Sequence, residues 1–283
     1  MSDWLQALLL GIIEGITEFL PISSTGHLLI AEHWLGRRSD LFNIAIQAGA
    51  ILAVVAIYRQ RLWQLLRAFT SGDAEDSRTT LPAAGDMTQS PRDYAWKLLL
   101  AFGVTAVLGV AVKLAGFELP TQLGPIAWAL VIGGGLMLLA EQLAARRVAL
   151  LGERATITWA VALLVGIAQV AAGVFPGTSR SAAAIFVALL AGTTQRVAAT
   201  EFAFLVGIPT MFAATGYALL DLLKDKGAGG EDWTLLAIAF VTSAITAFVA
   251  VKWLLRYIQT HRFTAFAIYR IALGGALLVW MGR

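Results

Sequence analysis

The sequence predicts an all-α, polytopic membrane protein with an inverted-topology repeat, built from about six transmembrane helices and two re-entrant helical hairpins. Composition indicates the class. Of the 283 residues, 58% are hydrophobic and only 14% are charged, whereas soluble globular chains carry roughly 45–50% apolar and about 25% charged residues. Too little polar surface remains to cover a water-facing domain of this length, so lipid must be the surrounding solvent.

The same composition excludes several functional classes. Cysteine is absent, which removes thiol redox centres, Cys-ligated zinc sites and disulfide frameworks. The net charge of +3 reflects basic loops that flank apolar segments, so we expect membrane lipid and no nucleic acid among the partners. The sequence leaves the oligomeric state open, and a homo-oligomer is compatible with it.

Six apolar runs, each bounded by charged or turn residues, are the expected spans, because a transmembrane helix needs about 20 apolar residues. They cover residues 41–58, 94–114, 124–141, 200–223, 233–255 and 263–281. The polar stretch 70–93 lacks apolar periodicity and predicts a mobile cytoplasmic loop. No basic residue precedes Arg37, so the N-terminal apolar region is not expected to be a cleaved signal peptide.

Two further apolar regions, residues 4–35 and 156–190, are each interrupted by a proline and a run of small hydroxyl residues. The interruptions read PISSTGH at 21–27 and PGTSRS at 176–181. A polar turn of this length cannot face lipid. Each region therefore predicts two half-helices joined by a turn, a re-entrant hairpin whose tip is buried in protein.

The two hairpins also mark a repeat. A shift of 155 residues aligns Pro21 with Pro176 and Ser24 with Ser179, and it places Glu14 on Gln169. The halves, about 1–150 and 151–283, each contain one hairpin followed by three spans, and an odd number of crossings inverts the second half relative to the first.

Basic residues indicate the orientation. With the hairpins returning to their own side, thirteen Lys and Arg residues fall on one side and six on the other, so the first side is expected to be cytoplasmic. Both termini would then lie outside, with the first hairpin entering from outside and the second from inside.

Glu14 and Glu18 lie four residues apart, so a helix projects both from one face. An ionisable side chain within an apolar segment is costly and usually marks function. Paired carboxylates can hold a divalent cation such as Mg²⁺ or Ca²⁺, and one of them can act as a general base. The alternative is that both are merely solvated at an aqueous rim.

The turn after these carboxylates supplies three hydroxyls and a histidine. A hydroxyl at a helix start often serves only as a cap, which accounts for one of Ser23, Ser24 and Thr25 but not for all three beside His27. A structural role is the usual one for a lone histidine, yet the neighbouring carboxylates favour function for His27.

The second turn is typical of an anion site. Gly177 allows close backbone approach, a helix start presents free N–H groups, and Ser179 and Ser181 add donors. Arg180 supplies a planar fork suited to phosphate. Alternatively, Arg180 pairs with Glu14 or Glu18 and neutralises a buried charge.

Three other charged residues lie within or at the ends of the apolar runs, and structural roles are expected for them. Glu201 and Arg270 are expected to form a structural ion pair between spans of the second half, with a catalytic role as the alternative. Glu141 is expected at a span end or in a loop.

Together, the two tips predict a phosphate-handling site inside a lipid-facing protein, and a lipid-linked phosphate is the natural ligand. The residues expected to contact its phosphates are Ser23, Thr25, Gly177, Ser179, Arg180 and Ser181. A transporter that carries such a lipid without cleaving it is the competing class. The surplus of reactive groups, Glu18, Ser24 and His27, favours an enzyme.

The sequence also resembles a known family, the undecaprenyl-diphosphate phosphatases of the bacitracin-resistance type. EGITEFLPISSTGH at 14–27 is similar to that family's first signature and PGTSRS at 176–181 to its second, while Ala182 and Ala184 replace residues commonly Gly and Thr. Length, span pattern and repeat agree over essentially the whole chain.

The resemblance implies hydrolysis of undecaprenyl diphosphate to the monophosphate and inorganic phosphate, with a divalent cation, in the bacterial inner membrane, and bacitracin resistance on overproduction. By position, Glu14 and Glu18 would be the acidic, metal-binding pair, and Arg180 the phosphate clamp. Ser24 and His27 would be the catalytic centre. We expect Ser24 to attack the terminal phosphorus while Glu18 or His27 accepts its proton. His27 as nucleophile and metal-activated water remain the alternatives.

Overall fold

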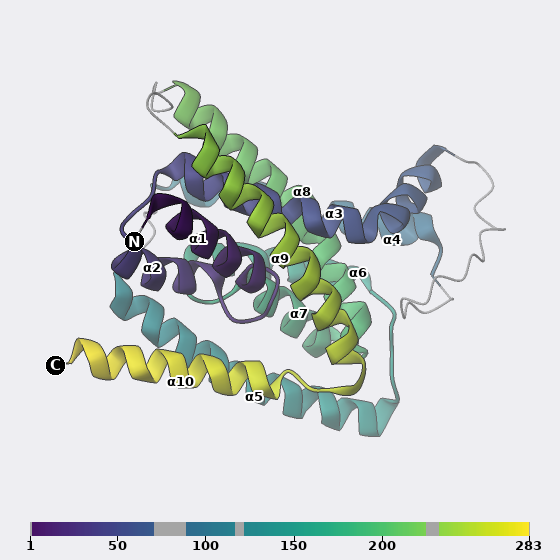
Figure 1. Cartoon of the computed structure of the whole chain (residues 1–283). Helices are drawn as coiled ribbons and strands as arrows, with labels where there is room; N and C mark the ends of the chain where they lie inside the picture. Colours follow the sequence, from purple (N-terminus) through teal and green to yellow (C-terminus); the bar gives the residue numbers. More distant parts are fainter. Residues whose placement is uncertain (1, 71–88, 117–121, 225–231, 283) are drawn as a thin grey trace.

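The computed structural model describes residues 2–70, 89–116, 122–224 and 232–282, and within these residues the chain forms ten α-helices and no strand (Figure 1). Their bounds are α1 Asp3–Thr17, α2 Ser24–Leu35, α3 Asp40–Thr70, α4 Pro91–Leu114, α5 Leu123–Leu151, α6 Trp159–Val174, α7 Arg180–Ala191, α8 Arg196–Lys224, α9 Trp233–Thr260 and α10 Thr264–Met281.

Six of these helices, α3, α4, α5, α8, α9 and α10, are long and apolar enough to cross a membrane. The chain is therefore a multi-pass membrane protein, as predicted. Several spans extend beyond their apolar runs, because helices continue where charged side chains can reach water. The helix α4 begins at Pro91 rather than at 94, since Ser90 caps it by accepting from Asp93 N at 3.1 Å and proline suits a first helical position. Most of the loop expected at 70–93 falls at 71–88, outside the described residues.

The four short helices form the two expected hairpins: α1 with α2, called the first hairpin, and α6 with α7, called the second. Both tips use the same backbone device. Ser23 and Ser179 adopt φ values of 75° and 70°, a left-handed conformation that is uncommon for residues other than glycine. Each side chain then caps the following half-helix, Ser23 at Gly26 N (3.4 Å) and Ser179 at Ala182 N (3.3 Å).

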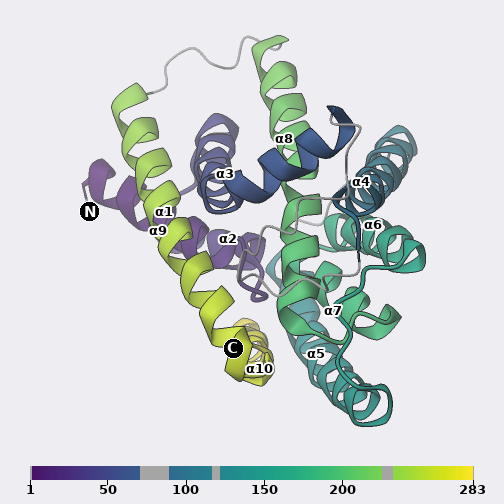
Figure 2. The ribbon, with the colours of Figure 1, turned by 90° about the vertical axis from the view of Figure 1, so that its right-hand side faces the viewer.

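The hairpins pack against opposite halves of the chain. In the first, α1 lies along α9, and in the second, α6 lies along α4, at opposite sides of the molecule in Figure 2. Between them α3 contacts α8, and α5 runs beside α10. Each hairpin thus packs against a span from the other half, which is consistent with an inverted repeat. The boundary between the halves near residue 150 stays a prediction.

Glycines allow both hairpins to approach their spans closely. A Cβ on Gly15 would lie 2.4 Å from Ser243 O on α9, and a Cβ on Gly166 would lie 2.7 Å from Ala101 O on α4. The Thr105 hydroxyl donates to Gly166 O at 3.0 Å. Helices in lipid associate through close packing of small residues and through such hydrogen bonds, because burying apolar surface gives little gain in free energy there.

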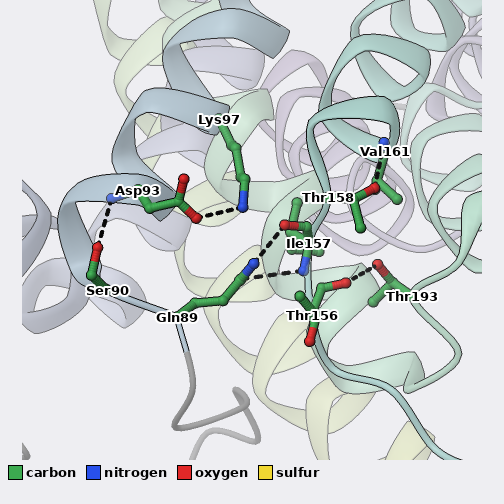
Figure 3. A network of polar contacts seen from close by, with 9 residues as sticks. All are labelled: Gln89, Ser90, Asp93, Lys97, Thr156, Ile157, Thr158, Val161 and Thr193. Carbon is green, nitrogen blue, oxygen red and sulfur yellow. Dashed lines mark hydrogen bonds and ion pairs between the residues drawn. The ribbon is translucent and has the colours of Figure 1, made fainter.

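Polar contacts join the segment before α6 to Gln89, just before α4, and to Thr193, between α7 and α8 (Figure 3). The Gln89 amide donates to Ile157 O at 2.6 Å and accepts from Ile157 N at 3.2 Å. The Thr193 hydroxyl donates to Thr156 O at 2.9 Å, and Lys97 pairs with Asp93 at 2.5 Å within α4. These bonds satisfy both backbone groups of Ile157 and the carbonyl of Thr156, and so hold the extended segment before α6 in place.

Candidate active site at the hairpin junction

The tips of the two hairpins meet at Glu18, which caps the C-terminal end of α1. One carboxylate oxygen, Oε2, accepts a short hydrogen bond from the Ser24 hydroxyl at the start of α2. The other, Oε1, lies 3.6 Å from Nη2 of Arg180, the first residue of α7. A buried carboxylate therefore lies between a hydroxyl of its own hairpin and a guanidinium of the other. Of the two pairings considered for Arg180, the structure contains the one with Glu18.

A second link joins the tips through hydroxyls. Ser181 Oγ donates to Leu20 O of the first hairpin at 3.1 Å and lies 3.1 Å from Ser179 Oγ. Ser179 is also the cap of α7. Both hydroxyls therefore already have partners, and neither is presented as a free donor.

Two buried polar side chains at the junction are left without hydrogen bonds. Both carboxylate oxygens of Glu14 are buried and unpartnered, as is Nε2 of Gln169. Glu14 is 0% exposed and stands one helical turn before Glu18. A fully buried carboxylate without a donor is rare in proteins, and orphaned oxygens beside a second carboxylate suit a hard cation. Glu14 and Glu18 therefore offer carboxylate oxygens of the kind that a divalent cation needs. Binding of the cation that the resemblance implies stays a prediction.

His27 is held away from Ser24 by two other partners. Its Nδ1 lies 2.7 Å from Ser23 O, and its Nε2 lies 2.7 Å from the Tyr269 hydroxyl on α10, with the two rings stacked at 5.6 Å. A carbonyl can only accept, so Nδ1 carries a proton and Nε2 accepts from Tyr269. In this arrangement Glu18, not His27, is the base in contact with the Ser24 hydroxyl.

A cavity of about 20 Å³ lies beside the Glu18–Arg180 pair. Its polar wall consists of Glu18, Gln169, Arg180 and Ser181, and its apolar wall consists of Phe19, Ala184, Ala203, Phe204, Gly207 and Met211. A space of this size, with several polar partners, holds about one water molecule. The polar wall comes from both hairpins and the apolar wall largely from α8.

The other residues predicted to contact phosphate are Ser23, Thr25 and Gly177. Ser23 is buried and acts as the cap of α2, Thr25 is exposed, and Gly177 has φ of +92° with its carbonyl bonded to Arg270. Their roles toward a phosphate remain predictions.

Two predictions about buried charges are wrong. Glu201 pairs with Arg61 of α3 at 3.3 Å rather than with Arg270, which instead donates to backbone carbonyls. Glu141 is not at a span end but is 3% exposed within α5. It accepts two hydrogen bonds from Arg196 and one from Phe263 N, so it joins the starts of α8 and α10. In both cases helices distant in sequence supply the partner.

Sequence reasoning did not include Gln169 and Tyr269 among the site residues. Gln169 carried a usable signal, because the repeat aligns it with Glu14. Tyr269 carried none, since it lies 242 positions from the histidine it contacts.

Comparison of the sequence with known proteins identifies its family. A family model described as Bacitracin resistance protein BacA matches residues 7–276. The chain belongs to this family. The undecaprenyl-diphosphatase of Stenotrophomonas maltophilia is 62% identical over 281 residues, 99% of this chain and 98% of that protein. Those of Xanthomonas euvesicatoria and Xanthomonas campestris are 59% and 58% identical over the same length. Family membership agrees with the resemblance seen in the two signature segments.

Proposed function

We infer that this chain is an undecaprenyl-diphosphate phosphatase, which hydrolyses the terminal anhydride of undecaprenyl diphosphate to give undecaprenyl phosphate and inorganic phosphate. The relatives named for this activity match it over nearly their whole length. Such a reaction recycles the lipid carrier of cell-wall synthesis, so overproduction should confer bacitracin resistance.

The observation that carries this function is the arrangement of Ser24, Glu18 and Arg180. A hydroxyl bonded to a carboxylate is a nucleophile with its base. A guanidinium beside them is a bidentate donor for phosphate oxygens. Binding alone would need the guanidinium but not the hydroxyl–carboxylate pair, so the geometry favours hydrolysis over transport.

In the first step, the Ser24 oxygen attacks the terminal phosphorus while its proton passes to Glu18. The anhydride P–O bond breaks, and undecaprenyl phosphate leaves with the bond electrons. Arg180, whose side chain is 33% exposed, can turn from Glu18 toward the phosphate oxygens as charge develops there.

In the second step, a water molecule attacks the phosphorus of the phosphoserine and the Ser24 Oγ–P bond breaks. Glu18 returns the proton it holds to the Ser24 oxygen and accepts the proton that the water gives up, and inorganic phosphate is released. The cavity bordered by Glu18 and Gln169 supports such a water at this position. His27 is less favoured as nucleophile, because Nδ1 is bonded to Ser23 O and Nε2 to the Tyr269 hydroxyl, which leaves no ring nitrogen free to attack.

A divalent cation would be held by Glu14 and Glu18, whose oxygens include two without any partner. When bound, it would supply positive charge to the diphosphate and its leaving group. Glu14 and Glu18 would then hold that charge next to Ser24.

We also propose that the protein lies in the bacterial cytoplasmic membrane with its termini and active-site opening outside. The excess of Lys and Arg at the opposite ends of the spans supports this orientation. The cysteine-free chain allows a direct test. A cysteine replacing exposed Arg37 should react with an impermeant maleimide in intact cells, whereas one replacing exposed Glu153 should react only after permeabilisation. The reverse pattern would overturn the orientation.

The activity is tested by phosphate release from undecaprenyl diphosphate by the detergent-purified protein, with and without EDTA. Ser24→Ala should abolish release, and Ser2→Ala, which removes an exposed serine hydroxyl without a cap hydrogen bond, should not. EDTA should reduce release, and added Mg²⁺ or Ca²⁺ should restore it. Tight lipid binding by the wild-type protein without any release would instead favour a transporter.

A further inference from the structure

Arg270 is a charged residue in the middle of a membrane-spanning helix with no charged partner. It lies in α10, is 0% exposed, and forms no ion pair with any carboxylate in the described parts of the chain. An intramembrane arginine is costly and calls for a functional explanation. The proposed chemistry at Ser24 does not use it.

Its guanidinium instead contacts backbone carbonyls from both hairpin tips and from α5. Nη1 donates to Thr178 O at 3.0 Å and more weakly to Pro21 O at 3.5 Å. Nη2 donates to Gly177 O at 2.9 Å and to Ala129 O at 3.2 Å. One side chain therefore bridges the turn of the first hairpin, the turn of the second and a spanning helix.

The choice of arginine follows from the hairpins themselves. Breaking a helix within the membrane leaves carbonyls without intrahelical donors, and lipid cannot supply donors. Arginine carries five N–H donors in a planar fork and keeps its charge. Four carbonyl dipoles surround the charge in place of a carboxylate.

Gly133 of α5 provides the space for this fork. A Cβ at Gly133 would lie 2.2 Å from Nη2 and 2.9 Å from Cζ of Arg270. The guanidinium is fully buried and hydrogen-bonded to carbonyls of three segments, so it could not move away from such a Cβ without losing hydrogen bonds. By contrast, a Cβ at Gly135, two residues later on the same helix, would meet nothing within 4 Å.

We propose that Arg270 is a positioning residue that locks the two hairpin tips in register, so that Arg180 of the second tip faces Glu18 and Ser24 of the first. It acts through the tip backbones and does not touch the substrate. The proposal deepens the phosphatase function above and rests on it for its kinetic consequences, but the lock itself is a property of the fold.

The test compares three variants with one matched control. Arg270→Met removes the donors, Arg270→Lys keeps a charge but not the fork, and Gly133→Ala displaces the guanidinium while leaving it intact. Gly135→Ala is the control on the same helix. Misplacement of reacting groups by about 1 Å can cost about 100-fold in rate, so we expect kcat to fall about 10- to 100-fold in Arg270→Met and in Gly133→Ala. Arg270→Lys should be intermediate, Gly135→Ala unchanged, and KM within about threefold of wild type throughout.

Hydrogen–deuterium exchange provides a readout that does not depend on activity. Amide exchange in the tip segments 18–26 and 175–181 should accelerate in Arg270→Met and Gly133→Ala, while exchange in α3 and α9 stays as in wild type. Acceleration throughout the protein would mean that Arg270 only supports global stability, and the proposal would be wrong.

Two further outcomes would also overturn it: accelerated tip exchange with wild-type kcat, or a KM increase that accounts for the whole loss of kcat/KM, as expected if Arg270 bound the substrate directly. If the wild-type protein released no phosphate at all, the phosphatase function would fail. The exchange data would still decide whether Arg270 locks the tips.

Discussion

The two hairpins have tips with the same backbone conformation but with different charged side chains. Both tips turn on a serine with positive φ whose side chain caps the second half-helix, Ser23 in one and Ser179 in the other. The first hairpin then carries two carboxylates, Glu14 and Glu18, whereas the second carries Arg180 as the first residue of α7. Opposite charges therefore meet where the two tips meet.

Two hairpins with the same backbone turn can therefore divide one reaction between them. In the proposed mechanism, the first hairpin supplies the nucleophile, the base and the cation ligands, and the second supplies the guanidinium that binds the phosphate. Neither hairpin contains a complete site. Substitutions in the first hairpin should therefore affect nucleophilic attack and proton transfer. Substitutions in the second should affect stabilisation of the negative charge on the phosphate.

Among substitutions that remove a charge, the largest effect is expected from replacing the carboxylate at the first tip. Glu18→Gln takes away the partner base of Ser24 and one cation ligand, and we expect kcat to fall by about 1,000-fold or more, since a general base alone contributes about 100- to 10,000-fold. Phosphate release measures the loss. Glu153→Gln, in an exposed loop, is the control and should retain wild-type turnover. Retention of more than a tenth of the activity in Glu18→Gln would show that another group is the base.

A somewhat smaller effect is expected from the clamp of the second tip. Arg180→Ala should lower kcat/KM about 100- to 1,000-fold, because a preorganised donor at a developing charge contributes about that much. Arg180→Lys should recover only part, since lysine lacks the planar fork. The exposed Arg37→Ala serves as the control. Equal activity of the Lys variant and wild type would argue against bidentate binding.

Stability should respond to how closely each hairpin packs on its span. Gly15→Ala places a Cβ 2.0 Å from Thr246 Oγ1 and 2.4 Å from Ser243 O, and such overpacking costs about 1–3 kcal/mol. Gly173→Ala in the second hairpin meets nothing within 4 Å and should be neutral or slightly stabilising, because alanine favours helices. Thermal unfolding in detergent gives the comparison. A higher Tm for Gly15→Ala than for Gly173→Ala would contradict this packing.

The smallest effect should come from the turn serines. Ser179→Ala loses the cap and keeps a side chain at positive φ, so it should be destabilised by about 1 kcal/mol. Ser179→Gly loses the same cap but relieves the backbone strain, so it should be closer to wild type. If Ser179 mainly binds phosphate, both variants should instead lose activity equally while their Tm values stay unchanged.

Much of the architecture could be predicted from the sequence because its signals are local. The apolar runs gave the spans, and Pro21 and Pro176 with their hydroxyl runs gave both hairpins. The Glu18–Arg180 pairing was among the alternatives because the two tips carried the only complementary charges in the hairpin turns.

What could not be predicted depends on contacts between distant helices. The sequence predicts a carboxylate partner for Arg270, but its guanidinium donates to backbone carbonyls of the second hairpin's turn. Those carbonyls lack helical donors only because the chain turns there, and every residue has a carbonyl, so the sequence does not indicate them. Glu141 is the charged residue that ends an apolar run, so the sequence predicts a span end there. The helix α5 instead continues to Leu151, and Arg196 pairs with the Glu141 carboxylate.

In the proposed mechanism, Ser24, activated by Glu18, attacks the substrate at the hairpin junction. The most direct test is rapid quenching of the enzyme with undecaprenyl diphosphate radiolabelled in its terminal phosphate, followed by peptide mapping. We predict acid-stable label on the peptide containing Ser24 and none in Ser24→Ala. Label on His27, or full turnover by Ser24→Ala with no labelled protein, would contradict the account.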